Sequence, residues 1–491
     1  MSKKVAVIGA GYSGLSAASS LAQKGYDVTL FEKNDQTGGR SRMLKQDGFL
    51  FDMGPSWYWM PDVFENYFAQ FGKKVEDYYQ LKRLDPSYQI YFGKDDVLKI
   101  PASIEELCTL FEEIEPGSSS RLKTFLAEAA YKYDVGINDL VHKPSLSWLE
   151  FVDMRIIKGV LKMHLFSSFS KYVRKHFSNR KLIQLLEFPV LFLGAKPEKT
   201  PALYSLMNYA DLCLGTWYPM GGMNQIASGM TKLAEELGVK IRTNANVEKI
   251  IALNGLVSSI TVNGVEHKTD LVVAAADYNH VEQKLLPEVQ KDYTQKYWNK
   301  RVMAPSSLVY YVGVNKKLKN LLHHNLFFDE DFGLHAKEIY DNPQWPEKPL
   351  FYVSVTSVTD PSSAPEGCEN LFILIPVAPG LEDTQAIRDH YYNLVINRLE
   401  TLTEQRIREN VITKKDYAHK DFIQDYNSFK GNAYGLANTL KQTALLKPRM
   451  KSKKLNNLYY VGQLTTPGPG VPPALISGQV VAKLISKNHK N

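Results

Sequence analysis

Three glycines near the N-terminus have the spacing of a site that binds a dinucleotide. An apolar run typical of a buried strand leads directly into Gly9, Gly11 and Gly14, which form a GxGxxG pattern. Gly9 allows a tight turn, Gly11 lets the backbone approach a pyrophosphate, and Gly14 lets a helix pack closely on a strand. A helix is predicted over residues 13–24, and the N–H groups at its start favour negative charge. We therefore predict a pyrophosphate at this helix start, with Ser13 among its contacts.

The next predicted strand ends at a carboxylate that extends the same site. Strand-forming residues Asp27–Phe31 precede Glu32, which lies about 18 residues after Gly14. A carboxylate at this distance binds ribose hydroxyls and repels the 2′-phosphate of NADP, so the sequence argues against NADP. We place the neighbouring Lys33 in the same predicted site.

A second pair of glycines follows and bears on the identity of the cofactor. Gly38 and Gly39 allow the chain to turn beneath the pyrophosphate, and Arg40 can donate charge-assisted hydrogen bonds to it. With this pair, the region resembles the superfamily of FAD-dependent amine oxidases and carotenoid desaturases, in which a second glycine pair marks FAD. The resemblance implies that Val247 contacts the adenine through its backbone. It also implies a loop beside the isoalloxazine ring that contains Gly54, Pro55, Ser56 and Trp57.

The C-terminal region carries the most specific part of the resemblance. Residues Thr466–Pro472, named here the closing segment, have the sequence Thr-Pro-Gly-Pro-Gly-Val-Pro and are similar to a pattern of the bacterial phytoene-desaturase type of carotenoid desaturase. The resemblance implies that the closing segment covers the isoalloxazine edge, where Gly468 and Gly470 permit close approach. The superfamily often has an acidic residue at the position of Gln463, although an amide also binds a ribityl hydroxyl. The implied cofactor contacts here are Gly462, Gln463, Gly470, Val471 and Pro472.

The resemblance extends over the whole chain and implies an enzyme that desaturates an acyclic carotenoid. A hydride would pass from the polyene to flavin N5 while a proton leaves the neighbouring carbon. The implied substrate is phytoene or a 1-hydroxycarotenoid desaturated at its 3,4 bond, and the shared motifs do not choose between them. Asp153 and Arg155 are the implied catalytic candidates. The alternative interpretation of this pair is a helix N-terminal acid beside a surface arginine.

Three other functions stay open at this point. A flavin amine oxidase would share the N-terminal motifs, although the closing segment argues against it. A carotene isomerase that uses reduced FAD would share the whole pattern. A carotenoid-binding protein with a vestigial flavin site is the third, and the intact Glu32, Arg40 and Gly470 argue against it.

The composition is that of an ordinary globular protein and excludes several classes. The 491 residues carry a formal net charge of +7. No basic run with interleaved stacking aromatics matches a nucleic-acid module, so we expect no nucleic-acid partner. Three scattered cysteines form no CxxC pair. The adjacent His323 and His324 are predicted to form a polar loop, and we expect no metal site.

The start of the chain and its hydropathy bear on its location. The residues after Met1 enter the first predicted strand directly, without the pattern of a signal peptide. No uncharged apolar run approaches the ~18 residues that a membrane-spanning helix needs. We therefore expect a cytoplasmic protein without a transmembrane helix.

Residues 155–181 mix apolar and basic side chains in a way that has two interpretations. They contain eight Lys and Arg and no Asp or Glu, with apolar residues at three- and four-residue spacing. The first interpretation is a helical pair with one buried face and a solvated basic face. The second is an element that lies on anionic lipid, as an enzyme for membrane-dissolved hydrocarbons requires. We expect a helical membrane-associating segment near residues 155–195 and a peripheral membrane protein.

The elements that must position these residues indicate an α/β fold. We predict a Rossmann-like FAD-binding domain interleaved with a mixed α+β substrate domain. The FAD-binding domain is assigned residues 1–80, 217–290 and 455–491, and the substrate domain residues 81–216 and 291–454. Helices are predicted through most of 103–209 and over 225–237 and 384–402. Strands are predicted over 87–92, 97–100, 239–242, 247–251, 270–275, 308–314, 350–355, 371–376 and 458–461.

Overall fold

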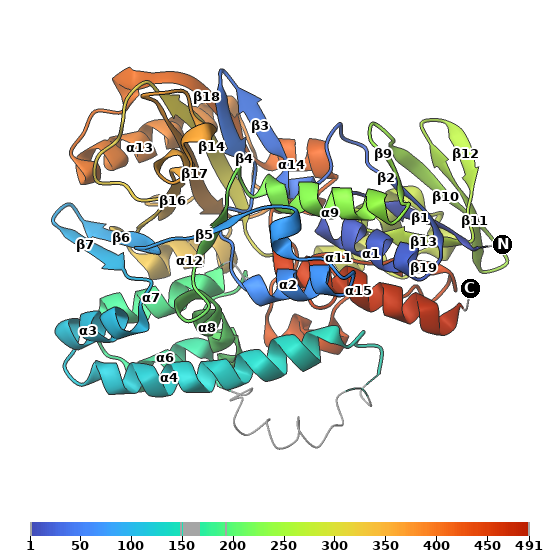
Figure 1. Ribbon diagram of the computed structural model, residues 1–491, viewed down its shortest axis with the longest axis horizontal. Helices are drawn as coiled ribbons and strands as arrows, with labels where there is room; N and C mark the ends of the chain where they lie inside the picture. Colours follow the sequence, from blue (N-terminus) through green and yellow to red (C-terminus); the bar gives the residue numbers. More distant parts are fainter. Residues whose placement is uncertain (1, 148–149, 151–166, 192–193, 490–491) are drawn as a thin grey trace.

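The computed structural model describes residues 2–147, 150, 167–191 and 194–489 (Figure 1). A five-stranded parallel sheet lies at one end of the molecule, with the strand order β19-β13-β1-β2-β9. These strands come from three separate stretches of the chain, which fall within the three segments predicted to bind FAD. The strands are β1 (Lys4–Ile8), β2 (Asp27–Phe31), β9 (Lys240–Arg242), β13 (Leu271–Ala274) and β19 (Leu458–Tyr460).

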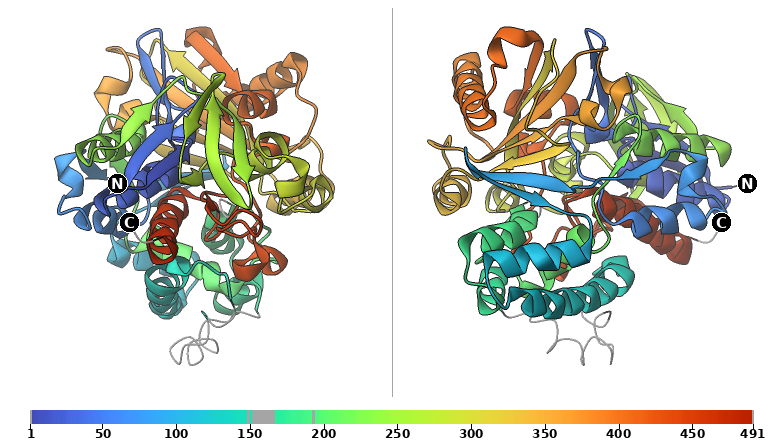
Figure 2. Two further views of the ribbon diagram at one scale, coloured as in Figure 1. Left: turned by 90° about the vertical axis from the view of Figure 1, so that its right-hand side faces the viewer. Right: turned by 60° about the vertical axis from the view of Figure 1, so that its left-hand side comes forward.

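Three helices lie side by side over one face of the parallel sheet (Figure 1). Helix α1 (Tyr12–Gln23) contacts both α9 (Asn224–Glu236) and α15 (Val471–Asn488). Gly478 of α15 faces α1 so closely that a Cβ atom there would lie 2.5 Å from the backbone oxygen of Ser13. The two ends of the chain are therefore packed directly against each other, and both termini lie on the same side of the molecule (Figure 2).

A three-stranded antiparallel sheet covers the opposite face of the parallel sheet. Side chains alternate along β1, which explains this packing. Ala6 and Ile8 pack against the small sheet, at Ile250 and Ile260. Val5 and Val7 point the other way and face α1. A turn at Asn263 and Gly264 joins two of its strands. The strands are β10 (Val247–Leu253), β11 (Leu256–Val262) and β12 (Val265–Lys268).

A seven-stranded mixed sheet forms the other half of the molecule, with the order β18-β14-β17-β16-β15-β6-β7 (Figure 1). Its side chains again alternate, because Leu308 and Tyr310 pack against helix α13 (Gln385–Thr403) while Val309 and Tyr311 face the main core. The strands are β6 (Tyr88–Gly93), β7 (Asp96–Ile100), β14 (Ser306–Val314), β15 (His324–Phe327), β16 (Phe351–Ser354), β17 (Glu369–Val377) and β18 (Val411–Tyr417).

A group of helices lies together on one side of the seven-stranded sheet (Figures 1 and 2). Ser103 caps the first of them, because its Oγ accepts a hydrogen bond from Glu106 N. Across the described part of the chain, no helix is both long enough and apolar enough to span a bilayer. The helices of this group are α3 (Ile104–Ile114), α4 (Ser118–Tyr133), α6 (Phe169–His176), α7 (Arg180–Leu191) and α8 (Leu206–Leu212).

Shorter elements connect these layers. Strands β3 (Met43–Gln46) and β4 (Phe49–Asp52) form one two-stranded sheet, and β5 (Leu81–Arg83) pairs with β8 (Trp217–Pro219) in another. The remaining α-helices are α2 (Pro61–Ala69), α10 (Tyr278–His280), α11 (Gln295–Asn299), α12 (Phe332–Tyr340) and α14 (His419–Tyr426).

Within the described ranges, the predicted elements are confirmed to within a few residues at their ends, and one prediction is wrong. His323 and His324 do not form a polar loop: they are 4% and 0% exposed, and His324 begins β15. Each imidazole has a hydrogen-bonding neighbour through Nδ1, with Thr359 Oγ1 and Tyr352 Oη at 2.7 and 2.6 Å. Two adjacent polar residues usually indicate an exposed loop, but these hydrogen-bond partners allow the two histidines to be buried. The division of the chain into two domains stays a prediction.

Candidate functional site

A cavity of about 350 Å³ lies at the carboxyl ends of the parallel strands and extends to the seven-stranded sheet. This volume falls within the ~300–1,000 Å³ of small-molecule sites. The last residues of β1 and β2, Ile8 and Phe31, line it, as does Ala275 directly after β13. In open α/β sheets, ligands bind beyond the carboxyl ends of the strands, so the topology alone places a ligand here.

The N-terminal glycines form the turn at the entrance to α1. Gly9 has φ +101°, and its N–H donates to Phe31 O at 2.7 Å, so the turn is fixed to β2. A Cβ atom at Gly11 would meet nothing within 4 Å and would project into open space. Gly14 lies outside the cavity lining, and a Cβ there would lie 2.0 Å from the Gly9 oxygen. Gly9 and Gly11 therefore shape the cavity, whereas Gly14 permits the helix to pack.

Glu32 is held by backbone donors at the edge of the cavity. It is 5% exposed, and its Oε2 accepts from Ala10 N at 2.8 Å while its Oε1 accepts from Asn34 N at 2.9 Å. Val247 lines the cavity at the start of β10, and the preceding Ala245 donates its N–H to Glu32 O at 2.8 Å. Lys33 also lines the cavity, with its ammonium donating to a backbone oxygen. These predicted residues therefore lie together, as a ribose and an adenine require.

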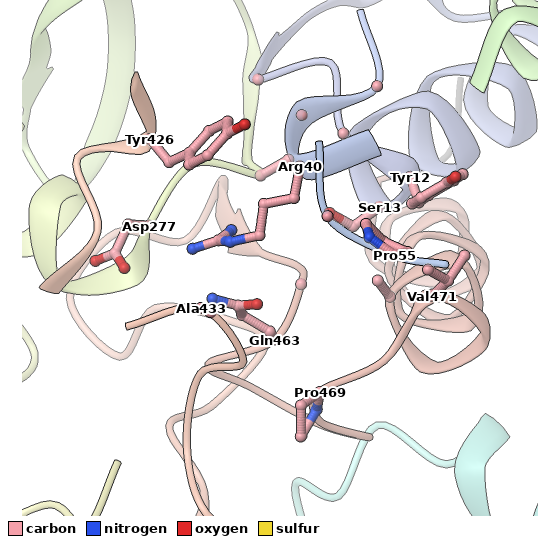
Figure 3. Close-up of a pocket in the computed structure, with 18 of the residues that line it drawn as sticks. Tyr12, Ser13, Arg40, Pro55, Asp277, Tyr426, Ala433, Gln463, Pro469 and Val471 are labelled. Atoms are coloured by element: carbon pink, nitrogen blue, oxygen red, sulfur yellow. The ribbon is translucent and has the colours of Figure 1, made fainter. Parts of the chain in front are cut away.

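The second glycine pair places a half-buried cation in the cavity. Gly39 has φ +56°, and a Cβ atom there would lie 3.2 Å from Gly11 Cα, so the two glycine turns are in close contact. Arg40 extends from this turn into the space between Tyr426, Asp277 and Gln463 (Figure 3). Its guanidinium lies 5.1 Å from the Tyr426 ring centroid. Its Nε is buried and has no hydrogen-bond partner among the described residues.

Two residues of this end of the cavity were missed from the sequence. Asp277 follows β13, and its carboxylate accepts from His280 N at 3.1 Å and from Phe429 N at 3.2 Å. Burial raises the pKa of Asp277 to about 6. Its position just beyond a parallel strand is a signal that could have identified it. Tyr426 ends α14, far away in the sequence, and no local pattern marks it.

The predicted isoalloxazine loop lies between the two ends of the cavity. Gly54, Pro55, Ser56 and Trp57 all line it, and a Cβ atom at Gly54 would lie 2.7 Å from the Arg40 oxygen. The Trp57 ring stacks on His324, with centroids 4.1 Å apart and an interplanar angle of 12°. Burial lowers the pKa of His324 well below its usual value, so this neighbour is a neutral ring.

The C-terminal residues close the cavity on the side of α15. Gly462, Gln463, Gly470, Val471 and Pro472 all line it. Ser13 also lines the cavity and lies beside Gly462, where a Cβ atom would be 3.3 Å from Ser13 Oγ. The Gln463 amide donates to Asn432 Oδ1 at 3.1 Å, so Asn432 orients it. Gly468 is absent from this lining, and its close neighbour is the buried side chain of Lys447.

The opposite end of the cavity is apolar. Its wall is formed by inward-facing residues of β14, β16 and β17 together with the loop that follows β4. Three hydroxyl groups interrupt this wall. Tyr352 Oη lies 2.6 Å from His324 Nδ1, whereas Ser307 and Tyr434 lie side by side and the buried Ser307 Oγ makes no hydrogen bond of normal geometry within the described residues. We name this wall the substrate end; it contains Trp59, Met60, Ser307, Val309, Tyr352, Phe372, Leu374 and Tyr434.

The lining residues at the other end of the cavity, around Gly11, Glu32 and Arg40, are named the nucleotide end. They fit FAD. Glu32 offers a carboxylate to a ribose, Gly11 leaves space for a pyrophosphate, and Arg40 presents a buried donor without a partner. The catalytic candidates Asp153 and Arg155 lie outside the described residues. Within the described part of the chain, no cluster of three His, Cys, Asp or Glu could hold a metal ion.

Comparisons with known proteins identify the family of the chain. The profile of the family described as flavin-containing amine oxidoreductase matches residues 12–486. Carotenoid 3,4-desaturase of Haloarcula japonica is 42% identical over 482 residues, which cover 98% of this chain and 97% of that protein. A 4,4′-diapophytoene desaturase of Staphylococcus aureus is 32% identical over 497 residues, 99% of each chain.

Among solved structures, an oxidoreductase from Methanosarcina mazei shares the fold. Its TM-score is 0.62 at 16% identity, and the match covers 98% of this chain and 100% of that one. The fold, the fit of the nucleotide end and the two curated relatives lead to one assignment. The chain belongs to the flavin-containing amine oxidoreductase family and, within it, to the carotenoid desaturases, with FAD as its cofactor.

Proposed function

We propose that this protein desaturates an acyclic carotenoid by transferring a hydride from the polyene to FAD. The observation that carries the proposal is the continuous cavity, which joins a site suited to a dinucleotide to a wall of apolar and aromatic side chains. A polyene offers no charge, so an apolar wall is what can bind it. The curated relatives, which are named for carotenoid desaturation, support the same substrate class.

The residues of this chain would bind and orient the reactants and exclude water. FAD, when bound, supplies the hydride acceptor. Glu32 and Arg40 would hold the ribose and the pyrophosphate, and Gly470 would let the closing segment approach the ring. Among the described residues, the substrate end contributes hydroxyls but neither a carboxylate nor an imidazole. This agrees with a reaction in which hydride loss leaves a delocalised cation that gives up its proton without a strong base.

Asp153 and Arg155 remain proposed catalytic residues. The resemblance that singled them out implies a position facing the flavin ring. Replacing Asp153 with Asn should lower turnover while FAD content stays normal, since the role that the resemblance implies is in the reaction and not in cofactor binding. Unchanged turnover in that variant would leave the chemistry to the flavin alone.

Within this class, we propose a substrate that carries a hydroxyl group, such as a 1-hydroxycarotenoid desaturated at its 3,4 bond. The support is the pair of hydroxyls at Ser307 and Tyr434 in a mostly apolar wall. A buried hydroxyl without a partner costs roughly 1–3 kcal/mol, which a hydrogen bond to the substrate would recover. Phytoene has no group that could do so. Ser307→Ala should therefore slow turnover of a hydroxylated carotenoid more than turnover of phytoene.

We also propose that the protein binds anionic membranes peripherally, through the exposed face of α6. Phe169, Tyr172 and Val173 of this helix are buried, so its contact with lipid would rest on charge alone. Lys171 and Lys175 are exposed. Residues 155–166 of the basic segment lie outside the described residues.

The contacts of the basic residues in α6 decide which of them should be replaced in a test of membrane binding. Arg174 forms an ion pair with Glu187, whose side chain is 4% exposed, so replacing this arginine would also disturb the core. Lys171→Gln with Lys175→Gln leaves that pair intact. Each lysine near the surface contributes about 1 kcal/mol, so the double variant should sediment less with anionic liposomes. Equal sedimentation of the parent with anionic and neutral liposomes would contradict the proposal.

The reaction itself is tested by mixing the FAD-loaded protein anaerobically with acyclic carotenoids in liposomes. The flavin absorbance should bleach while a product with longer-wavelength absorption appears, because the conjugated chain lengthens. A flavin that is reduced by primary or secondary amines, and by none of the carotenoids, would identify an amine oxidase instead. Conversion that requires an added reductant, with no lengthening of conjugation, would identify an isomerase.

A further inference from the structure

A buried lysine contacts the closing segment without lining the cavity. Lys447 is 3% exposed and follows the short turn Ala444–Leu446. Its Nζ donates to Pro467 O at 2.8 Å and to Asn438 Oδ1 at 2.8 Å. Among the described residues, no carboxylate pairs with this ammonium, and burial lowers its pKa to about 7. The chain therefore buries an ionisable amine whose two hydrogen-bond partners are neutral acceptors.

Gly468 lies directly over this ammonium. Its φ is +136°, and a Cβ atom there would lie 2.1 Å from Lys447 Nζ and 3.1 Å from Asn438 Oδ1. The following residues, Pro469 and Gly470, line the cavity. The lysine therefore contacts the closing segment at Pro467 and Gly468, directly before the two residues that line the cavity, and does not line the cavity itself. The sequence predicted that Gly468 permits approach to the flavin, but the side chain that needs the missing Cβ is Lys447.

A second contact braces the same stretch. Pro448, the neighbour of Lys447, accepts a hydrogen bond through its backbone oxygen from Thr465 Oγ1 at 2.6 Å. Residues 447–448 therefore hold the chain at Thr465 and again at Pro467. A hydrogen bond from an ammonium is stronger than one between neutral groups. The contact of Lys447 with Pro467 is therefore stronger than the contact between Thr465 and Pro448.

We propose that Lys447 is a positioning residue for the cofactor: by fixing Pro467, it holds Pro469 and Gly470 in the place that the flavin requires. The inference rests on the proposed role of the closing segment as the cover of the isoalloxazine edge. Burying an uncompensated ammonium costs stability, and a contact maintained at that cost indicates a specific requirement for geometry. Lys447 acts through the backbone and does not itself line the cavity.

The structure offers a matched control in a second buried lysine. Lys132 is 0% exposed, its Nζ donates to Ser205 Oγ at 3.1 Å, and the ammonium lies 3.8 Å from the Tyr172 ring centroid. Burial lowers its pKa as well, to about 8. It belongs to α4 and lies outside the cavity lining. Lys132→Met therefore removes a buried ammonium without touching the closing segment.

The test is titration of the apoprotein with FAD, for the parent and for Lys447→Met, Lys447→Arg and Lys132→Met. Lys447→Met should raise the dissociation constant for FAD about tenfold and shift the absorbance maxima of the bound flavin. Lys447→Arg keeps the charge and the donors, so it should restore most of the affinity. Lys132→Met should bind FAD as the parent does, with the same flavin spectrum.

Equal FAD affinity and an unchanged flavin spectrum in Lys447→Met would overturn the inference. An equal loss of affinity in Lys132→Met would do the same, since the effect would then come from general destabilisation. If Lys447→Met does not fold, Asn438→Leu removes one acceptor and decides the matter by the same titration. A parent protein that binds no FAD would instead refute the proposed function, so the two failures are distinguishable.

Discussion

The two ends of the cavity recognise their ligands by different means. At the nucleotide end, recognition depends on backbone conformation: glycine turns open space for phosphates, and backbone N–H groups hold the Glu32 carboxylate. At the substrate end, it depends on side chains that separate elements of the fold bring together, such as Val309 and Leu374 from neighbouring strands. A buried carboxylate lies in the nucleotide end and another lies behind the substrate end: Glu32 is held by N–H donors and Asp211 by hydroxyls.

This difference reflects what each ligand offers. A dinucleotide presents charges and hydroxyls at fixed distances, so a few well-placed donors and acceptors suffice to bind it. A carotenoid presents apolar surface along its length, so its binding energy scales with the apolar area buried. A substitution at the nucleotide end should therefore act on FAD affinity, and one at the substrate end on turnover. Four predictions test this separation, from the largest effect to the smallest.

The largest effect is expected at Gly11. In Gly11→Val, the side chain projects into the open space where a pyrophosphate would lie, so FAD affinity should fall by about 100-fold or more, roughly 2.7 kcal/mol. The measurement is the flavin content of the purified protein and FAD titration of the apoprotein. Gly93→Val is the control, because its added Cβ also meets little, with Asp96 Cβ at 3.8 Å, far from the cavity. Normal flavin content in Gly11→Val would contradict the assignment of the nucleotide end.

The reverse pattern is expected at Leu374. This residue is 8% exposed and points from β17 into the substrate end, so Leu374→Trp fills space that the polyene needs. Turnover should fall about 10- to 100-fold while flavin content stays normal. Leu374→Met, which nearly conserves volume, should retain most of the turnover. A loss of FAD in Leu374→Trp with unchanged turnover per flavin would break the separation of the two ends.

A smaller effect on affinity is expected at Glu32. Glu32→Gln keeps an oxygen for Ala10 N but removes the charge that a ribose hydroxyl would donate to. The expected loss is about tenfold in FAD affinity, since a hydrogen bond to a charged group contributes roughly 1.5–3 kcal/mol. Turnover at saturating FAD should remain close to that of the parent. A turnover defect that persists at saturating FAD would show that Glu32 also acts on the reaction.

The smallest effect concerns Asp211, behind the substrate end. Its carboxylate accepts from Tyr88 Oη at 2.8 Å and from Thr216 Oγ1 at 3.2 Å, and Thr216 in turn accepts from Trp59 Nε1 at 2.8 Å. Burial raises the pKa of Asp211 to about 7, above its ordinary value of 3.8. The stability that this group contributes is therefore full below pH 3.8 and is lost as the pH rises through about 7.

Asp211→Asn should remove this pH dependence. Between pH 6 and pH 8 the parent should lose about 1 kcal/mol of unfolding free energy that the variant does not lose. Urea unfolding of both proteins at the two pH values measures the difference, and FAD content should be normal in both. Parallel pH profiles for parent and variant would mean that Asp211 is ionised throughout this range.

The two ends also differ in how far the sequence could predict them. Gly9, Gly11, Gly38 and Gly39, which the sequence predicted at turns around a pyrophosphate, all line the cavity, because a glycine pattern reports backbone conformation directly. Asp277 and Tyr426 were missed, since one lies beyond a strand without a motif and the other comes from a distant helix. The substrate end has no comparable sequence pattern. None of its residues was named in advance, apart from Trp57 at its border.

The parallel sheet, its glycine turns and the carboxylate at Glu32 could be predicted from the sequence, because they depend on local conformational preferences and short spacings. The residues that line the same wall of the cavity could be identified only from the three-dimensional packing. It placed Ser307 beside Tyr434, stacked Trp57 on the buried His324, and set Lys447 beneath Gly468. Contacts of this kind join residues that are far apart along the chain, and their geometry is fixed by the packing of whole layers rather than by any local pattern.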